Sequence, residues 1–184
     1  MDYPDPLITH PCRKIVFTIR SRDQGWGGDQ QDHDTYHGSW TWFEAGVERW
    51  TNNAGDGSPE AQQQPSLVLE DLSTVYPTVT GSEADTGFDH PLHPQEHLKI
   101  QCNKTAARET QEHRVVWSYT DDTDPENETA AAELAANGRG TATGDGKFVR
   151  DLKLGDIITV WGKTRFQGWT NNVESVKVDV YWVV

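Results

Sequence analysis

The final thirty residues carry the clearest pattern of apolar and polar positions in this chain. The run at 157–166 is apolar and rich in β-branched residues, which are typical of strands. Residues 167–172 then supply Gly, Trp and two Asn, which suit a tight connection. Beyond them, apolar side chains recur at nearly every second position up to Trp182, with charged residues in between. This alternation indicates a half-buried strand, so the pattern predicts a closing β-hairpin.

Strand-like patterns also occur earlier in the chain. Ile15, Phe17 and Ile19 alternate with polar residues and would share one face of a strand at 14–20. Other strands are predicted at 35–44, 97–102 and 114–119, and the stretch 67–72 fits a short strand or a helical turn. Many short strands with little helix indicate an all-β fold, an antiparallel β-sandwich of jelly-roll or galactose-binding-like type.

Three polar stretches separate these strands. Residues 52–66 and 80–95 are almost free of large apolar side chains, and 121–147 begins with a strongly acidic run. All three are predicted to be flexible loops. Good helix formers follow Pro125, which predicts one short helix at 126–136 and no other. The 184 residues fit a single domain with long polar loops.

The order of the strands predicts where two tryptophans lie. If the first and last strands pair antiparallel, the loop at 21–34 and the turn at 167–173 emerge at the same end of the sandwich. Each of these connections places a tryptophan, Trp26 or Trp169, among Gly and polar residues. The chain has eight Trp and one Met despite its polarity, so some aromatic side chains are expected to be exposed for binding.

Those two loops supply the candidate ligand-binding residues. Aromatic faces stack on the C–H surface of a sugar, while planar amide, carboxylate and guanidinium groups bond its hydroxyls, and a rigid sheet holds such loops in place. The predicted set is Arg22, Asp23, Trp26, Arg165, Trp169, Asn171 and Asn172. The alternative is structural: both tryptophans cap the end of the sandwich and the asparagines serve the turn.

Charge excludes several other classes of partner. The net charge of −13 argues against nucleic acid and against anionic membrane surfaces, which both need clustered Lys and Arg. No apolar run is long enough to span a bilayer, and the N-terminal stretch lacks the pattern of a signal peptide. A cytoplasmic protein is therefore expected. In that setting Cys12 and Cys102 are expected to be two thiols, although adjacent strands would also allow a disulfide.

Metal and catalytic motifs are weak. The loop at 23–37 is rich in carboxylates and could hold calcium, but its spacing is not that of a calcium-binding loop. His33 and His37 would suit zinc only on a helix, and a run through His90, His93 and His97 has no supporting element. No nucleophile elbow, phosphate loop or dinucleotide fingerprint occurs. We therefore expect no cofactor and no catalytic residues. The alternative of an enzyme that uses a pair of carboxylates on a small ligand stays open.

Four stretches resemble a largely uncharacterised group of fungal β-sandwich proteins. They are CRKIVFTIRSRDQGWGG, GSWTWFEAG, RVVWSYTDD and RFQGWTNNVESVKVDVYW, and they are spread along most of the chain with other stretches between them. No activity is established for that group, so the resemblance implies a fold rather than a function.

A shorter pattern is similar to galactose-binding-like sandwiches, including the F-box-associated sugar-binding domains. It runs from Phe166 through Trp169 to Asn172 and into the last strand. In such domains ligands bind at loops on one end of the sandwich. The leading hypothesis is therefore a non-enzymatic, lectin-like module that binds carbohydrate. The alternatives are a module that binds a protein partner and, third, an enzyme, with the oligomeric state left open.

Overall fold

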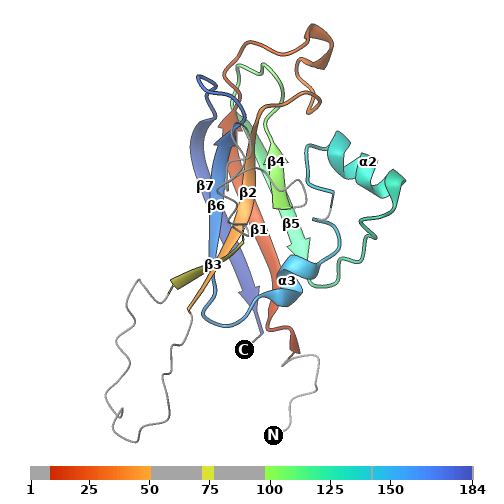
Figure 1. The fold of residues 1–184 in the computed structure, drawn as a ribbon, viewed down its shortest axis with the longest axis vertical. Helices are drawn as coiled ribbons and strands as arrows, with labels where there is room; N and C mark the ends of the chain where they lie inside the picture. The colour runs from red at the N-terminus through yellow and green to blue at the C-terminus, as the bar shows by residue number, and fades with distance from the viewer. Residues whose placement is uncertain (1–8, 51–71, 77–97, 142, 184) are drawn as a thin grey trace, which may run out of the picture.

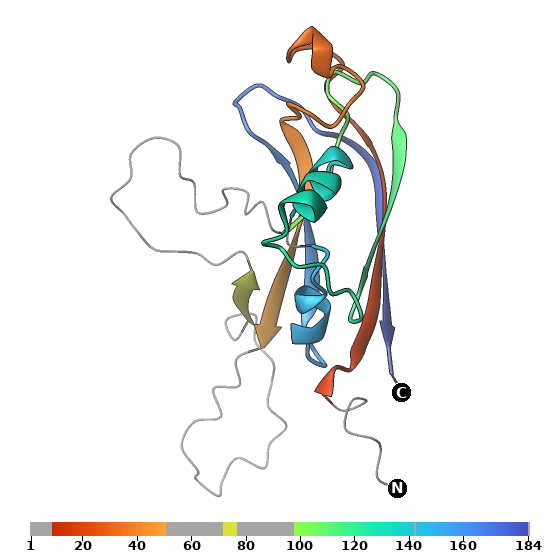
Figure 2. The same ribbon diagram turned by 90° about the vertical axis from the view of Figure 1, so that its right-hand side faces the viewer.

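The computed structural model describes residues 9–50, 72–76, 98–141 and 143–183, and within them it confirms an antiparallel β-sandwich. Figures 1 and 2 show two sheets stacked face to face, with two short helices beside them. The strands are β1 (Cys12–Arg22), β2 (Thr41–Trp50), β3 (Leu72–Tyr76), β4 (Lys99–Cys102), β5 (Gln111–Ser118), β6 (Ile157–Thr164) and β7 (Asn172–Trp182).

The first sheet has the order β5-β1-β7 and places β1 at its centre. Both neighbours run antiparallel to β1, so that Phe17 lies opposite Val115 on one side and Val178 on the other. Directly opposite residues share a face, and this register therefore turns the valines of both neighbours toward the second sheet.

The second sheet is built around β2. Strand β6 pairs along one edge of β2, while β4 and β3 pair in turn along the other. Beyond β4, Gly138 accepts a hydrogen bond from the Cys102 amide and Gly140 donates one to Lys99. The segment 138–140 thus satisfies backbone groups of β4 that would otherwise lie at an unpaired sheet edge.

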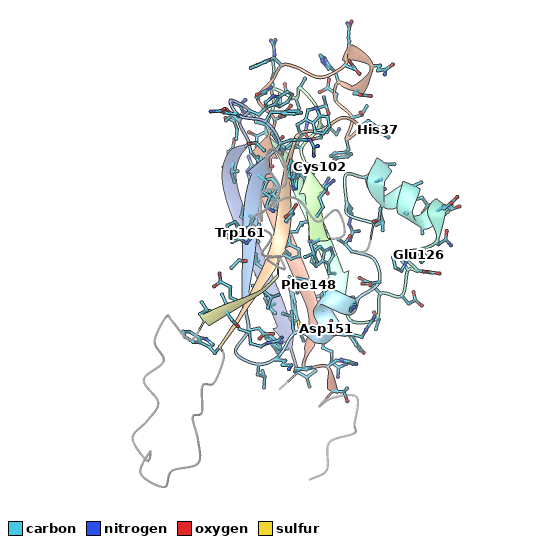
Figure 3. The ribbon with its side chains drawn as sticks, in the orientation of Figure 1. His37, Cys102, Glu126, Phe148, Asp151 and Trp161 are labelled. Atoms are coloured by element: carbon cyan, nitrogen blue, oxygen red, sulfur yellow. The ribbon has the colours of Figure 1, made fainter. Side chains whose placement is uncertain are left out.

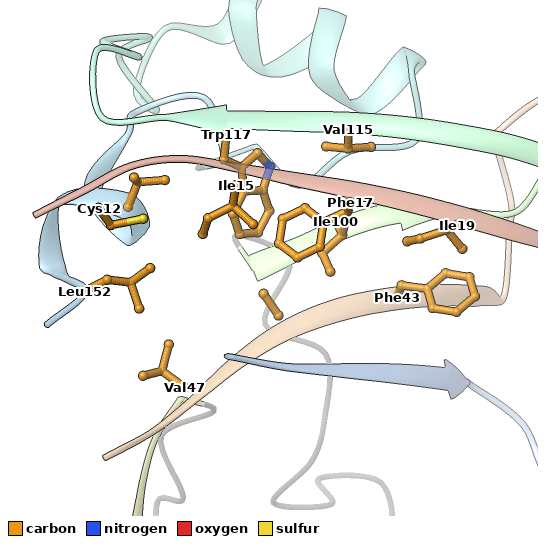
Figure 4. Close-up of a cluster of buried hydrophobic side chains, with 12 residues drawn as sticks. Cys12, Ile15, Phe17, Ile19, Phe43, Val47, Ile100, Val115, Trp117 and Leu152 are labelled. Atoms are coloured by element: carbon orange, nitrogen blue, oxygen red, sulfur yellow. The ribbon is translucent and has the colours of Figure 1, made fainter. Parts of the chain in front are cut away.

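The apolar core lies between the two sheets (Figure 4). The alternating face of β1 predicted from the sequence supplies Ile15, Phe17 and Ile19, all fully buried. Trp117 meets Phe17 edge to face, with ring centroids 4.9 Å apart. The remaining members of the buried cluster are Cys12, Phe43, Ala45, Val47, Ile100, Val115, Val149 and Leu152.

Two helices flank the sandwich where the sequence predicted one. Helix α2 (Glu128–Ala136) confirms the predicted helix, and the Asn127 side chain caps it by accepting from the amides of Thr129 and Ala130. Helix α3 (Lys147–Asp151) was missed because five residues give too little periodicity. It buries Val149, and the neighbouring Phe148 meets Trp117 at 5.0 Å, so α3 closes one end of the core.

The predicted closing hairpin is wrong. Strand β6 pairs with β2 in one sheet and β7 pairs with β1 in the other, and the turn between β6 and β7 crosses from sheet to sheet (Figure 1). Both arrangements give the same alternation along β7, because periodicity reports which face is buried and not which strand is adjacent.

Other boundaries differ in detail. The strand predicted at 35–44 begins only at Thr41 and extends to Trp50, because Gly38 adopts a positive φ of 62° and the chain turns there. Most of the 67–72 stretch, and the loops predicted at 52–66 and 80–95, lie outside the described residues. The 121–147 stretch, predicted to be a flexible loop, contains α2 and is attached to α3 through Arg150, which donates to the carbonyls of Tyr119 and Asp121.

Two further expectations concern the surroundings of the protein. Cys12 and Cys102 are both buried, and no disulfide joins them. Among the described residues, no helix combines the length and apolar character needed to cross a membrane.

Candidate ligand-binding site at the loop end

Three connections meet at one end of the sandwich, which we call the loop end: residues 23–40, 103–110 and 165–171 (Figure 1). The pairing of Arg22 with Asn172, where β1 ends and β7 begins, confirms the expected arrangement. Figure 3 shows the side chains of this end gathered beyond the end of β4, near the labelled Cys102 and His37.

The two tryptophans predicted to approach one another do so. The ring centroids of Trp26 and Trp169 are 6.2 Å apart with a tilt of 33° between their planes. Trp26 is 62% exposed, whereas Trp169 is half-buried beside Phe166 at 5.9 Å. Phe166 in turn meets Trp40 edge to face at 5.3 Å. These four rings form an aromatic cluster whose outermost member is Trp26.

Arg165 is attached to the other end of this cluster. Its guanidinium lies 5.3 Å from the ring centroid of Trp40 and 5.9 Å from that of Phe166. Stacking of this kind holds the planar group on the aromatic faces while leaving its donors toward solvent. Arg165 is therefore exposed but lies beside Trp40 rather than Trp26.

Asp23 has a different place from the one predicted. Its side chain is fully buried, and both carboxylate oxygens are used inside the protein. One oxygen accepts from the Thr41 hydroxyl at 2.9 Å, and the other accepts from the Ala106 backbone amide at 2.8 Å. Asp23 thus joins the end of β1 to β2 and to the 103–110 connection. The prediction that Asp23 bonds ligand hydroxyls does not fit this position.

Asn103 extends this buried polar network. It accepts a 2.6 Å hydrogen bond from Ser21, and its amide donates to the Thr41 hydroxyl and to the side-chain oxygen of Asn171, each at 2.9 Å. Ser21, Thr41 and Asn103 are all fully buried. Buried polar groups are retained in this way only when their partners are in place, so the network fixes the loops relative to both sheets.

The remaining predicted residues also serve this scaffold. The Asn171 amide donates to the carbonyls of Trp42 and Lys163, and the Asn172 amide donates to the carbonyl of Asp23. Arg22 makes a long 3.4 Å hydrogen bond to that same carbonyl. The structural alternative thus describes Asn171 and Asn172 better than direct ligand binding does, because the turn between sheets needs their amides.

An open cavity of about 660 Å³ lies beside Trp26. It is formed by the 23–40 and 103–110 connections and by the start of β5. Its lining residues are Gly25, Trp26, Gly27, His33, Asp34, Ala106, Ala107, Arg108, Glu109 and Gln111. Cavities that hold small molecules have volumes of roughly 300–1,000 Å³, so this one has room for a sugar ring and its substituents. Trp26 is the only predicted ligand-binding residue that borders it.

The cavity wall contains unusual backbone conformations. Asp34 and Ala106, with φ of 59° and 55°, are the only non-glycine residues with positive φ in the described part of the chain, and both line the cavity. Such conformations cost about 1–3 kcal/mol each and persist where the surroundings impose them. Here the Asp34 amide donates to Thr105, and the Ala106 amide donates to the buried Asp23. Gly27 also has positive φ, and a Cβ there would lie 3.1 Å from Trp169.

The cavity also presents polar groups suited to a ligand. The Gln111 side-chain oxygen is buried and has no hydrogen-bond partner, although such groups are normally satisfied. Arg108 donates from Nε to the Gly25 carbonyl at 3.1 Å, which directs a planar guanidinium along the wall. The His33 ring is held by a 3.1 Å contact between Nε2 and the Gly27 carbonyl. Glu109 adds an exposed carboxylate.

The metal-binding alternatives gain no geometric support. In the part of the chain that the structure describes, no three His, Cys, Asp or Glu side chains gather as a metal would require, including those of the 23–37 loop. The run through His90, His93 and His97 lies outside the described residues.

Sequence reasoning missed most of the cavity. Arg108, Glu109 and Gln111 lie in a polar stretch without any local motif, and they reach Trp26 only because β5 pairs with β1. The one usable signal was the strand predicted at 114–119, because antiparallel pairing with β1 would have brought its leading residues to the loop end.

Comparison with known proteins adds no assignment: no protein-family model, no curated protein and no solved structure matches this chain.

Proposed function

We propose that this protein is a non-enzymatic recognition module that binds carbohydrate in the cavity beside Trp26. One observation carries the proposal: an indole that is 62% exposed borders a cavity of about 660 Å³ whose wall contains a buried, unpartnered Gln111 oxygen. Exposed aromatic rings that gather beside a cavity are typical of a binding site, and an unpaired buried acceptor calls for a donor.

The chemistry of the wall fits a sugar. The Trp26 ring offers a face for the C–H surface of a pyranose, and contact with Trp169 limits its motion. A turn of the Gln111 side chain would bring its buried oxygen to the cavity, where it would accept a hydroxyl proton, while Arg108 and Glu109 supply a planar donor and an acceptor. In this proposal Asp23, Asn171 and Asn172 support the loops instead of touching the ligand.

The position of the cavity gives further support. It lies at one end of the sandwich, as do the ligand sites of the galactose-binding-like domains that the closing stretch resembles. The loops around it are fixed by buried hydrogen bonds to both sheets, which reduces the entropy lost on binding.

The test is a glycan array probed with the purified protein and with Trp26→Ala and Trp26→Phe. We expect selective binding that is lost in Trp26→Ala and partly kept in Trp26→Phe, which retains an aromatic face. Tyr181→Ala is the matched control, because Tyr181 is 46% exposed but lies at the far end of β7. Equal losses in Trp26→Ala and Tyr181→Ala, or no binding to any glycan, would contradict the proposal.

A second set of variants distinguishes the cavity from the rest of the aromatic cluster. Gln111→Leu should weaken binding about tenfold, because a hydroxyl in the cavity would lose its acceptor. Arg165→Ala should have little effect, since Arg165 lies beside Trp40 and does not line the cavity. Strong dependence on Arg165 together with indifference to Gln111 would place the ligand on the rings of Trp40 and Phe166 instead.

A further inference from the structure

Strand β7 has a free edge. In the part of the chain that the structure describes, β7 pairs only with β1 and forms the end of its sheet. It is eleven residues long, and three apolar side chains along it are exposed: Val173 by 46%, Val176 by 38% and Tyr181 by 46%. A long, partly apolar edge strand is a template for another strand, and most proteins block such an edge with charges or bulges.

The irregularities in the pairing of β7 with β1 lie at the two ends of β7 rather than in its middle. The register with β1 shifts between Arg20 and Ser21 and again between Cys12 and Lys14. Between these irregularities the ladder runs without interruption from Ser175 to Tyr181. The regular stretch therefore has seven residues and is centred on Val178.

The charges on this stretch complement themselves. Lys177 and Asp179 flank Val178 and lie on the outer face, where they already form an ion pair at 2.8 Å within one chain. If two β7 strands pair antiparallel about Val178, each Lys177 lies directly opposite the partner's Asp179. Sliding the strands so that Lys177 or Asp179 occupies the centre instead places that residue opposite its own copy, and like charges in that position are destabilising.

We propose that two copies of this chain associate through their β7 edges, antiparallel and centred on Val178, to form one continuous six-stranded sheet. Val176 of each copy then lies opposite Val180 of the other on the inner face, which covers apolar surface that the single chain leaves exposed. A two-fold axis through Val178 satisfies the requirement that a symmetric interface complement itself. The two loop ends point in opposite directions.

The first measurement is sedimentation velocity over a range of protein concentrations, at a salt concentration that screens the charge of −13 on each copy. A single strand junction buries little surface, so we expect a reversible, concentration-dependent dimer. A protein that stays monomeric at every accessible concentration would overturn the proposal.

Charge variants test the register. Lys177→Glu and Asp179→Lys each turn two attractive contacts into two repulsive ones and should weaken the dimer about tenfold or more. Mixing these two variants should restore association, because each then supplies the charge that the other needs. The double variant Lys177→Asp with Asp179→Lys should dimerise like the original chain. If neither single variant associates more weakly than the original chain, or if mixing the two variants does not restore association, this pairing is wrong.

Disulfide trapping gives an independent readout. Directly opposite residues in antiparallel strands have Cα atoms about 4.5–5.5 Å apart, a separation that a disulfide accepts. Val178→Cys should therefore cross-link two copies on mild oxidation, while Val173→Cys, far from its own copy in this register, should not. Cross-linking at 173 without cross-linking at 178 would overturn the register, and circular dichroism confirms that both variants fold.

Discussion

The inner face of β1 changes character between Ile19 and Ser21, and its apolar half and its polar half are equally buried. Ile15, Phe17 and Ile19 face the second sheet with apolar side chains, whereas Ser21, followed beyond the strand by Asp23, continues the same face with polar ones. All five side chains are fully inaccessible to solvent. The difference between the halves is therefore not one of burial but of what the buried groups contribute.

The apolar half contributes stability, and the polar half contributes position. Burying an apolar side chain gains roughly 1.5–3 kcal/mol from its removal from water, without requiring a particular orientation. Burying a hydrogen-bonded polar group gains little net free energy, but leaving it unpaired costs about 1–3 kcal/mol, so it accepts only one arrangement. The cavity is built at the polar half because its loops must be held in one conformation.

The largest effect is expected from truncating the apolar half. Phe17→Ala should destabilise the protein by about 3–5 kcal/mol, because it leaves a cavity against Trp117 that the two sheets cannot close. Urea unfolding followed by circular dichroism measures this loss. If Phe17→Ala cost no more than an exposed substitution such as Tyr181→Ala, the core would not lie where we place it.

Alkaline pH should also weaken the apolar half. Burial raises the pKa of the Cys12 thiol to about 11, partly offset by a hydrogen bond with the backbone of Lys14. Because the folded-state pKa lies above the unfolded one, this contribution to stability is complete below about pH 9 and is lost as pH rises toward 11. The loss approaches roughly 2–3 kcal/mol. Unfolding free energies of the original protein and of Cys12→Ala, measured from about pH 8 to about pH 11, isolate the loss caused by the thiol. Parallel pH curves for the two proteins would contradict this prediction.

A smaller and more local effect is expected in the polar half. Asp23→Ala leaves the Thr41 hydroxyl and the Ala106 amide without an acceptor and should cost about 1–3 kcal/mol. Its distinguishing readout is hydrogen exchange at the Ala106 amide, which should accelerate far more than exchange in β5 or β7. Uniform acceleration across the sheets would show that Asp23 supports the whole fold and not the loops alone.

The smallest effect is expected when the buried polar network loses the Ser21 hydroxyl. Ser21→Ala removes the 2.6 Å hydrogen bond to Asn103 and should cost about 1 kcal/mol, because Asn103 keeps its two donor contacts. Urea unfolding measures it. A loss as large as that of Phe17→Ala would remove the contrast between the halves.

These two halves also mark what could be predicted from the sequence. The alternation of Ile15, Phe17 and Ile19 predicted β1 and its buried face, since apolar periodicity depends only on residues near in the chain. Asp23 was predicted to bond a ligand, because its true partners, Thr41 and Ala106, are distant in sequence and no local pattern indicates them.

The strand order also decided which residues of the candidate site could be predicted from the sequence. Trp26 and Trp169 were placed together correctly, because that prediction needed only the pairing of the first and last strands. Gln111 and Arg108 were missed, because their approach to Trp26 depends on β5 occupying the other edge of β1. The hairpin error has the same origin, since nothing along β6 and β7 specifies which sheet each strand joins.

The central place of β1 also constrains how the chain can fold as it is made. Ile15 lies between Trp117 and Val180, so β1 pairs with two strands, β5 and β7, that are synthesised long after it. The first sheet is therefore incomplete until β7 has been synthesised. Contacts between such distant segments close slowly. While a nascent chain waits for β7, one edge of β1 stays open, and during translation this is the stretch we expect to recruit a chaperone.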